Sequence, residues 1–471
     1  MKLSRKQQER YLSNKNYRRY LNVLRRKYAR NADLERAYRR YLRESKEFTK
    51  GIKDKEKFLS FSPNIEYLYN SKAKFKADQY FKDNKGRFHV PKIFCLIENP
   101  NESYAFIYHL FHSLRAQSYS NIFIDYSRCE KIALGAQVYM DIILKDFIKF
   151  LKQCDSFGIH QKIQTIRGLN VNNEDIRKII FSVGSQAILA KQSINFPDII
   201  PYKLCERDRE KNIDPVKAIE QKDIDTTTLV DYVLDSLKKT ANKELTAEKR
   251  GDLCQVIGEA LINAEEHSTT RFRYSVGYCK DIQEDGKHYG LFNLVIFNFG
   301  QTIYEKFIDP ECPTQHIVTR MKELSQKYTN KKWFLPKSFE EESLWTLYAL
   351  QDGVTSKVNY PKRGNGCIQF IEAFFNIKGK GTFADDKSHM TILSGNTKIT
   401  FDGSYSTAEK KVDEEMYKIM TFNESNNIEE PPDKKYVTFV EEYFPGTMIC
   451  ATILFNDDDF IKNAEQQPQN N

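Results

Sequence analysis

Residues 258–270 read GEALINAEEHSTT and place three polar side chains at intervals of four. On a helix this spacing brings Glu259, Asn263 and His267 to one face, because residues i and i+4 lie above one another. The residues between them are mostly apolar and suit a buried face. The segment therefore predicts a helix that packs by one side and presents a polar line on the other.

The residue types in this polar line can perform proton transfer and bind a metal ion. A glutamate can accept a proton from an attacking water, and the amide oxygen of an asparagine can ligate the hard cation Mg²⁺. His267, one turn further on, would reach toward phosphate oxygens. The alternative interpretation is a helix with one solvated polar face, since a glutamate four residues before an asparagine arises easily by chance.

Three more stretches follow downstream in a fixed order. The strand LVIFNFGQTI carries Asn298-Phe299-Gly300, the start of a helix carries Arg363-Gly364-Asn365-Gly366, and Pro445-Gly446-Thr447 leads into the last strand. Glycines at a helix N-terminus let backbone N–H groups approach an anion, which the helix dipole also favours. The sequence therefore predicts a phosphate-binding turn at the second stretch.

This series resembles the GHKL ATPase superfamily, which includes gyrase, MutL, sensor histidine kinases and anti-sigma-factor kinases. The resemblance implies ATP and Mg²⁺ as cofactors, with Glu259 as catalytic base and Asn263 as the Mg²⁺ ligand. It assigns the remaining nucleotide contacts to His267, Asn298, Gly300, Gly364, Asn365, Gly366 and Thr447. The resemblance covers about 230 residues and implies an ATPase or a protein kinase.

One position departs from the family pattern. The family has an aspartate that accepts a hydrogen bond from the adenine amino group, and this chain has Asn298 there. An amide oxygen still accepts, but it is uncharged and its bond is weaker. The substitution predicts weaker adenine binding and leaves the base preference open, and a vestigial site that binds nucleotide poorly is the alternative.

The stretch 302–362, between the two glycine boxes, corresponds to the ATP lid of the family. Lys357 and Arg363 stand close to the phosphate loop in sequence, where a cation could meet the γ-phosphate and close the lid. The alternative is that the lysines near the loop are merely solvated.

The residues before this region predict a separate α/β body. Strand patterns at 92–98 and 121–127 alternate with helix patterns, the longest of them over 133–154. The second strand and long helix resemble the STAS fold of anti-sigma-factor antagonists. No hydroxyl occurs at 132–135, where that family is phosphorylated, and Ser127 lies too early, so the resemblance implies a scaffold or docking domain.

The whole chain is therefore expected to be α/β in class. We expect a basic helical arm (1–57), a STAS-like α/β domain (58–200), a linker (201–225), a two-layer α+β sandwich of the GHKL type (226–456) and a disordered tail (457–471).

Charge is distributed unevenly along the chain. Residues 1–57 carry 20 Lys/Arg and 7 Asp/Glu, a net of +13, which leaves −4 for the rest of a chain of net charge +9. Aromatics interleaved with arginines in this arm suit nucleic acid. A solvated helix that packs on the body or on a protein partner by its Tyr/Leu stripe is the alternative.

Other features of the sequence indicate the cellular compartment of the protein. No run of 18 apolar residues occurs, which predicts no membrane span, and the basic N-terminus lacks an apolar segment of the secretory type. Nine cysteines stand singly without a CxxC pair, which favours a reducing compartment and predicts a cytoplasmic protein.

Two functional hypotheses follow. In the first, the protein hydrolyses ATP, or uses ATP-driven lid closure and homodimerisation, to switch the STAS-like domain and the arm; protein kinase activity is a close variant. In the second, the nucleotide fold is a non-catalytic sensing scaffold whose basic arm binds nucleic acid or a protein partner.

Overall fold

The computed structural model describes residues 61–72, 85–156, 161–192, 194–208, 215–266, 269–284, 287–329, 338–356, 366–379, 381–412, 415–455 and 459–461. One compact unit contains residues 61–151 and 160–471. The predictions for the arm 1–57 and for residues 462–471 of the tail lie outside the described residues.

Short parallel sheets and helices make up the first part of this unit. Its elements are α3 (Pro63–Asn70), β1 (Arg87–His89), β2 (Ile93–Phe94), α4 (Pro100–Arg115), β3 (Asn121–Asp125), β4 (Lys131–Ile132), α5 (Leu134–Ser156), β5 (Thr165–Leu169), α6 (Glu174–Ser182) and α7 (Ser185–Leu189). The strands β1, β3 and β5 form a parallel sheet in that order, and β2 pairs with β4 in parallel. The predicted α/β alternation is thus present.

A five-stranded antiparallel sheet dominates the second part. Its elements are β6 (Ile199–Asp208), α8 (Pro215–Ala241), α9 (Ala247–Glu266), β7 (Phe272–Glu284), β8 (Lys287–Phe299), α10 (Ile303–Ile308), α11 (Gln315–Thr329), α12 (Glu341–Tyr348), α13 (Gly366–Ile377), α14 (Thr382–Lys387), β9 (His389–Phe401), β10 (Ala408–Val412), β11 (Glu415–Ile419) and β12 (Val437–Leu454). The large sheet has the order β6-β7-β8-β12-β9, and β10 and β11 form a separate hairpin. The chain is therefore mixed α/β.

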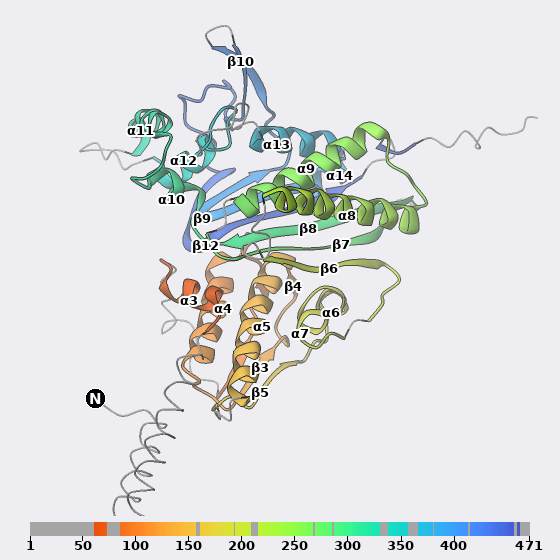
Figure 1. Ribbon diagram of the computed structural model, residues 1–471. Helices are drawn as coiled ribbons and strands as arrows, with labels where there is room; N and C mark the ends of the chain where they lie inside the picture. Colours follow the sequence, from red (N-terminus) through yellow and green to blue (C-terminus); the bar gives the residue numbers. More distant parts are fainter. Residues whose placement is uncertain are drawn as a thin grey trace, which may run out of the picture. The chain divides into compact units, whose positions relative to one another are not determined.

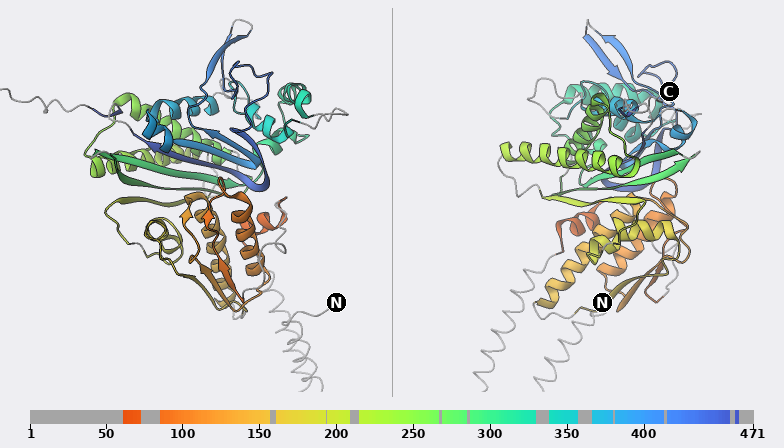
Figure 2. Two further views of the ribbon diagram at one scale, coloured as in Figure 1. Left: turned by 180° about the vertical axis from the view of Figure 1, so that it is seen from behind. Right: turned by 90° about the vertical axis from the view of Figure 1, so that its right-hand side faces the viewer.

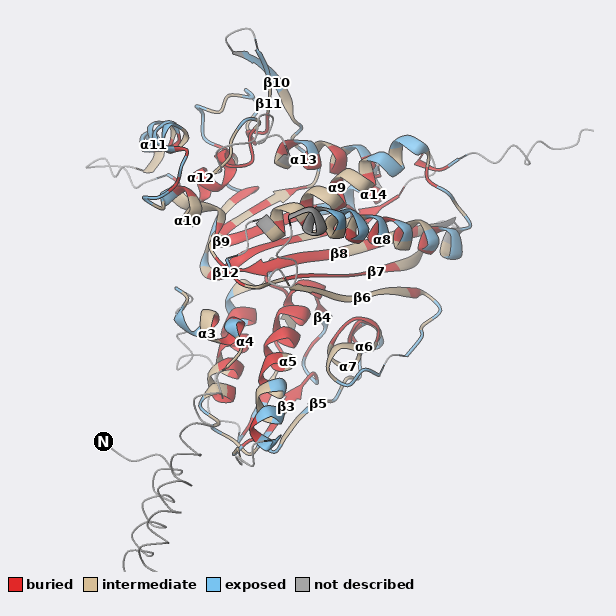
Figure 3. Ribbon diagram, in the orientation of Figure 1, coloured by how far each residue is buried: buried red, intermediate tan, exposed pale blue. Residues whose placement is uncertain are grey.

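The central strand β8 is buried on both of its faces. Phe292, Leu294 and Ile296 point into one apolar core, while the alternate residues Val295 and Phe297 point into the other. A strand buried on both sides reads as a continuous apolar run, as LFNLVIFNF does. Figure 3 shows the burial of β8 and β12 along most of their length.

Helices cover both faces of the large sheet. The core that contains Phe292, Leu294 and Ile296 joins the sheet to α8, α9 and α13. The core that contains Val295 and Phe297 joins it to α4 and α5. The Tyr108 hydroxyl on α4 donates to the carbonyl of Tyr443 on β12 at 2.9 Å. Figures 1 and 2 show the resulting stack, in which α4 and α5 lie between the five-stranded sheet and the small parallel sheet.

The expected two-layer sandwich is thus part of a larger stack. The residues of the predicted α/β body and of the predicted sandwich share one apolar core, because α4 and α5 are apolar on two sides. The segment 201–225, expected as a linker, holds most of β6 and the first turns of α8. Its prolines do not prevent this, since β6 is an edge strand of the sheet, where proline is tolerated.

The strands differ in how far they extend. After α9, β7 and β8 form a hairpin whose register runs to Glu284 opposite Lys287. Strand β9 continues through Gly395, where a φ of +60° accommodates a register shift against β12. The strand expected over 92–98 is reduced to β2.

The predictions for the cysteines and for membrane-spanning helices can also be compared with the structure. All nine cysteines are described, and each is a free thiol. None of the helices within the described ranges combines the length and the apolar run that crossing a bilayer requires.

The close approach of β12 to β8 at Gly446 generates the first prediction. Gly446 has φ +149°, and a Cβ there would lie 2.1 Å from the carbonyl oxygen of Asn298. Gly446→Ala should therefore lower the free energy of unfolding by roughly 2–5 kcal/mol, from backbone strain and overpacking, as measured by urea denaturation. The control Gly251→Ala, on α9 with nothing within 4 Å, should raise it by about 0.5–1 kcal/mol. Equal effects of the two changes would contradict the contact.

A buried carboxyl on α5 generates the second prediction. Asp141 Oδ1 accepts from Gln137 Nε2 at 2.8 Å and from the Ser185 hydroxyl, while its Oδ2 has no hydrogen-bond partner among the described residues. Burial raises the pKa of Asp141 to about 7. The folded state then binds this proton more tightly than the unfolded state, so stability falls as pH rises from about 4 through 7.

Asp141→Asn keeps the acceptor and removes the charge. The variant should be more stable than the parent above pH 8 by on the order of 3–4 kcal/mol and equal to it near pH 4, by urea denaturation at both values. A constant difference across this range would show that Asp141 does not titrate near neutrality.

Candidate functional site

The helix predicted over the opening segment is α9, which ends at Glu266. Its apolar residues Leu253, Val256, Ile257, Ala260, Leu261 and Ala264 are buried against the large sheet. Glu259 and Asn263 are half-buried and lie along one line of the helix. The polar line therefore flanks the packed face of α9.

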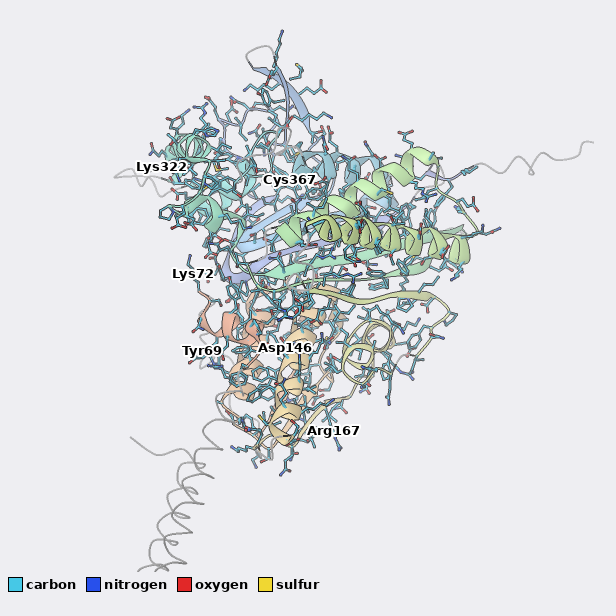
Figure 4. The ribbon with its side chains drawn as sticks, in the orientation of Figure 1. Tyr69, Lys72, Asp146, Arg167, Lys322 and Cys367 are labelled. Atoms are coloured by element: carbon cyan, nitrogen blue, oxygen red, sulfur yellow. The ribbon has the colours of Figure 1, made fainter. Side chains whose placement is uncertain are left out.

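This line lies against α13. Asn263 Nδ2 is 3.6 Å from the Sγ of Cys367, and Gln255 Nε2 donates to Gln369 Oε1 at 3.3 Å. Cys367 is the second residue of α13 and follows Gly366, the last glycine of the predicted phosphate loop (Figure 4). Two sequence stretches about a hundred residues apart are thus brought together at the N-terminal turn of α13.

A row of polar side chains crosses the large sheet on the face that α9 covers. Arg273 pairs in register with Asn298, Asn298 with Thr447, and Thr447 with Ser394. We call these four residues the polar row. The next pair on the same face, Ile296 with Ile449, is apolar and belongs to the core beneath α9. The row marks the end of the apolar surface of this face.

Asn298 lies in the middle of the row and is incompletely bonded. The side chain is fully buried; its Nδ2 donates to the Phe299 carbonyl at 3.3 Å, and its Oδ1 has no hydrogen-bond partner among the described residues. A buried acceptor without a donor costs about 1–3 kcal/mol. An incoming donor such as an amino group would remove this cost, once the groups that bury the oxygen have moved.

The hydroxyls at the other end of the row are fully bonded. Ser394 Oγ lies 3.0 Å from Thr447 Oγ1 and 3.2 Å from the carbonyl oxygen of Gly446, and it accepts from the N–H of Ile303 at 2.9 Å. Ile303 is the first residue of α10, in the region expected to form the lid. The row is therefore connected directly to the first lid helix.

Arg273 has hydrogen-bond donors that lack acceptors among the described residues, whereas Asn298 has an acceptor that lacks a donor. Its side chain is 1% exposed and forms an ion pair with Asp225 of α8, while Glu265 of α9 lies 4.0 Å from its Nε. The Nε and Nη1 groups have no hydrogen-bond partner among the described residues. The row thus contains both unpaired donors and an unpaired acceptor, which suits a ligand with mixed polar edges.

The backbone at Gly300 is also constrained. Its φ is +142°, and a Cβ would lie 2.5 Å from both the N and the Oγ1 of Thr269. The carbonyl of Gly300 accepts from the Tyr67 hydroxyl at 2.5 Å. Only glycine fits this turn.

The start of the lid region is anchored to the first part of the chain. Lys72 lies 2.8 Å from Glu305 of α10, and the Tyr443 hydroxyl donates to the same carboxylate at 2.9 Å. Burial alone would raise the pKa of Glu305, but bonds from Lys72, the Thr302 N–H and Tyr443 hold this pKa below its usual value. A charged Glu305 therefore ties α10 to β12 and to the end of α3.

The other helices of the region 302–362 have a small core of their own. Leu344 and Trp345 of α12 pack with Met321 of α11, and the Trp345 Nε1 donates to Ser325 Oγ at 3.0 Å. Glu342 Oε1 accepts from the Asn396 N–H at 2.7 Å and so attaches α12 to β9.

Part of the predicted site cannot be placed. His267, Lys357, Arg363, Gly364 and Asn365 lie outside the described residues. The structure brings Asn298 and Thr447 together in one row, and it brings Asn263 to the turn that begins at Gly366.

Sequence reasoning missed Tyr67, Arg273 and Ser394. Tyr67 comes from the other predicted body, and the other two belong to unremarkable strand patterns. Only the strand register shows that Arg273 and Ser394 align with Asn298.

Comparison with known protein families, with curated proteins and with solved structures finds no match for this chain.

The unpaired oxygen of Asn298 generates the third prediction. Asn298→Leu keeps the branched shape of the side chain and removes both the unpaired acceptor and the Nδ2 donor, while the Phe299 carbonyl still accepts from the Thr270 hydroxyl at 2.7 Å. Stability without ligand should therefore change by less than about 1 kcal/mol in urea denaturation. Ser394→Ala, the matched change in the same row, should lower stability because the Ile303 N–H loses its acceptor. A loss of more than about 2 kcal/mol in Asn298→Leu would show that the oxygen has a partner in the folded protein.

Proposed function

We propose that this chain is a Mg²⁺-dependent ATP-binding protein of the GHKL type that hydrolyses ATP or uses it as a conformational switch. The observation that carries the proposal is the convergence of the predicted boxes. Asn298 and Thr447 are register partners on β8 and β12, α9 covers their face of the sheet, and Asn263 lies beside the first turn of α13. The four stretches are spread over nearly 190 residues of sequence, and nothing in their spacing alone requires this arrangement.

Different elements of the chain would bind different parts of the nucleotide. The oxygen of Asn298 would accept from the adenine amino group, with the Thr447 hydroxyl beside it. The N–H groups at the start of α13 would favour phosphate, because the N-terminus of a helix carries a partial positive charge. Lys357 and Arg363 would add charge at the γ-phosphate.

Mg²⁺ suits the single ligand that α9 offers. This cation keeps several waters and binds through one or two protein oxygens together with substrate phosphates. Asn263 can supply one amide oxygen if its nitrogen stays toward Cys367. When bound, Mg²⁺ would neutralise charge on the phosphate oxygens.

Glu259 would act as the general base. It lies one turn before Asn263 on the same line of α9, so it would hold a water next to the phosphate end of the site and accept its proton. Its attachment to the packed helix α9 fixes its direction, which a loop residue would not guarantee. Loss of the carboxylate should therefore affect turnover far more than binding.

A non-catalytic, nucleotide-sensing scaffold is the second candidate. The observation that favours it is Asn298 itself, which is uncharged and fully buried. A base can reach its oxygen only after the covering groups move, and that movement would consume part of the binding energy. The bonds from Ser394 to Ile303 and from Tyr67 to Gly300 would transmit such a movement to α10 and α3.

The fourth prediction separates binding from turnover. Mg²⁺ with ATP should raise the thermal midpoint of the full chain, because a ligand that binds only the folded state stabilises it. Glu259→Ala should keep this shift and lower phosphate release about 10²–10⁴-fold. Gln255→Ala, one turn earlier on the same line, should leave both unchanged. Asn263→Ala should raise the Mg²⁺ concentration needed for the shift.

Each outcome selects one account. No shift of the wild-type midpoint with Mg²⁺ and ATP would contradict the proposed function. A shift with phosphate release no faster in the wild type than in Glu259→Ala would favour the scaffold. Equal, rapid release in both would contradict the assignment of Glu259 as base.

A further inference from the structure

The small parallel sheet is covered on one face by α4 and α5. Phe88, Ile122 and Ile124 point into the apolar core that contains these helices. The side view in Figure 2 shows the three strands as an outer layer beyond the helices. Parallel sheets are normally buried on both faces, so the composition of the outer face is informative.

The outer face carries a row of two arginines around a phenylalanine. Arg87 of β1 pairs in register with Phe123 of β3, and Phe123 pairs with Arg167 of β5. Partners in one register row of a sheet point to the same side. We call these three residues the Arg–Phe–Arg row.

The members of this row are open to solvent and poorly partnered. The Arg87 side chain is 47% exposed, Phe123 is half-buried, and Arg167 is exposed (Figure 4). Among the described residues, the Arg167 guanidinium has no ion pair and the Phe123 ring has no aromatic neighbour. The row therefore presents a flat apolar ring between two cations.

A carboxylate on the same face pairs with one of the two arginines. Asp125 follows Phe123 by two residues on β3 and therefore points to the same side of the sheet; its side chain is 2% exposed, and its Oδ2 lies 3.4 Å from Arg87 Nε. Asp125 also accepts from Asn170 Nδ2 at 2.9 Å and from the Ser127 N–H at 3.0 Å. Burial alone would raise the pKa of Asp125, but these bonds and His89 hold this pKa below its usual value. The charge of Arg87 is thus partly balanced, while Arg167 is the member of the row that has no ion pair among the described residues.

We propose that the Arg–Phe–Arg row binds single-stranded nucleic acid, with one base stacked on Phe123 and the flanking phosphates contacted by Arg87 and Arg167. An aromatic ring exposed on a sheet is a stacking platform for any base, and arginines beside it neutralise the backbone. Strands are about 4.8 Å apart, so the two arginines start about 10 Å from each other, on either side of the ring.

The charges of this chain disfavour two other occupants. The arm 1–57 has a net charge of +13 and would be repelled by the two arginines. A second copy of the same face would bring arginine against arginine. An acidic peptide would pair with the arginines but has no planar base to stack on Phe123. The experiment below distinguishes an acidic peptide from nucleic acid. The proposal does not depend on the polar row or on ATP.

The fifth prediction uses the full chain and a fluorescein-labelled 12-nucleotide oligo(U), followed by anisotropy at several salt concentrations. Phe123→Leu keeps an apolar side chain and removes the stacking surface, so affinity should fall about tenfold. The slope of log affinity against log salt should not change in this variant. Phe123→Tyr should bind like the wild type.

The arginines should have a different signature from the ring. Arg167→Ala should weaken binding and reduce the salt slope by about 0.7, the value for one phosphate contact on a single strand. Arg320→Ala, an exposed arginine on α11, serves as the matched control and should leave affinity and slope unchanged. Thermal midpoints within a few degrees of the wild type show that each variant is folded.

Three results would overturn the proposal. The first is wild-type affinity in a folded Phe123→Leu variant. The second is an equal loss in Arg167→Ala and Arg320→Ala, which would indicate attraction by overall charge. The third is displacement of the oligonucleotide by oligo-glutamate at equal charge concentration, which would assign the face to acidic peptides.

Discussion

The contact of Gly446 with the Asn298 carbonyl is the constraint on which the site depends. It allows β12 to lie against β8 right up to the end of the sheet, where both strands change from apolar to polar side chains. Because side chains alternate along each strand, this register places Asn298 and Thr447 on the face of α9 and leaves Phe299 and Met448 for the opposite core. A slip of β12 by one residue against β8 would turn Thr447 toward α4 and α5 and leave Asn298 on the face of α9.

The same contact joins parts of the chain that are distant in sequence. Helices α4 and α5 occupy the second face of the large sheet, and Tyr67 and Lys72 from the first part reach Gly300 and Glu305 beside the polar row. A change at the row would therefore reach both the lid helices and α3. This physical continuity is what a nucleotide-driven switch requires, whether or not the chain turns over ATP. It also leaves the small parallel sheet as the outer layer, with one face available to a partner.

The sequence predicts those features that depend on a single element or a single turn. The four-residue spacing of Glu259 and Asn263, the apolar run of β8 and the glycines at 300, 366 and 446 each reflect one element or one turn. The sharing of a core between α5 and β8 is a long-range fact, and no local pattern encodes it. The same holds for Arg273 and Ser394, which join the row only through strand register. The linker expectation failed because Pro201 and the charges around it also suit an edge strand, and Pro215 suits the start of a helix. The family resemblance, the cofactors and the roles of the site residues stay predictions.

The most direct test of the account is a crystal structure of the full chain with Mg²⁺ and a non-hydrolysable ATP analogue. The account predicts a purine against Asn298 and Thr447, phosphates at the first turn of α13, and a cation beside the Asn263 amide oxygen. Analogue bound elsewhere, or a polar row that stays closed and empty at saturating analogue while α9 and α13 keep their contact, would contradict it.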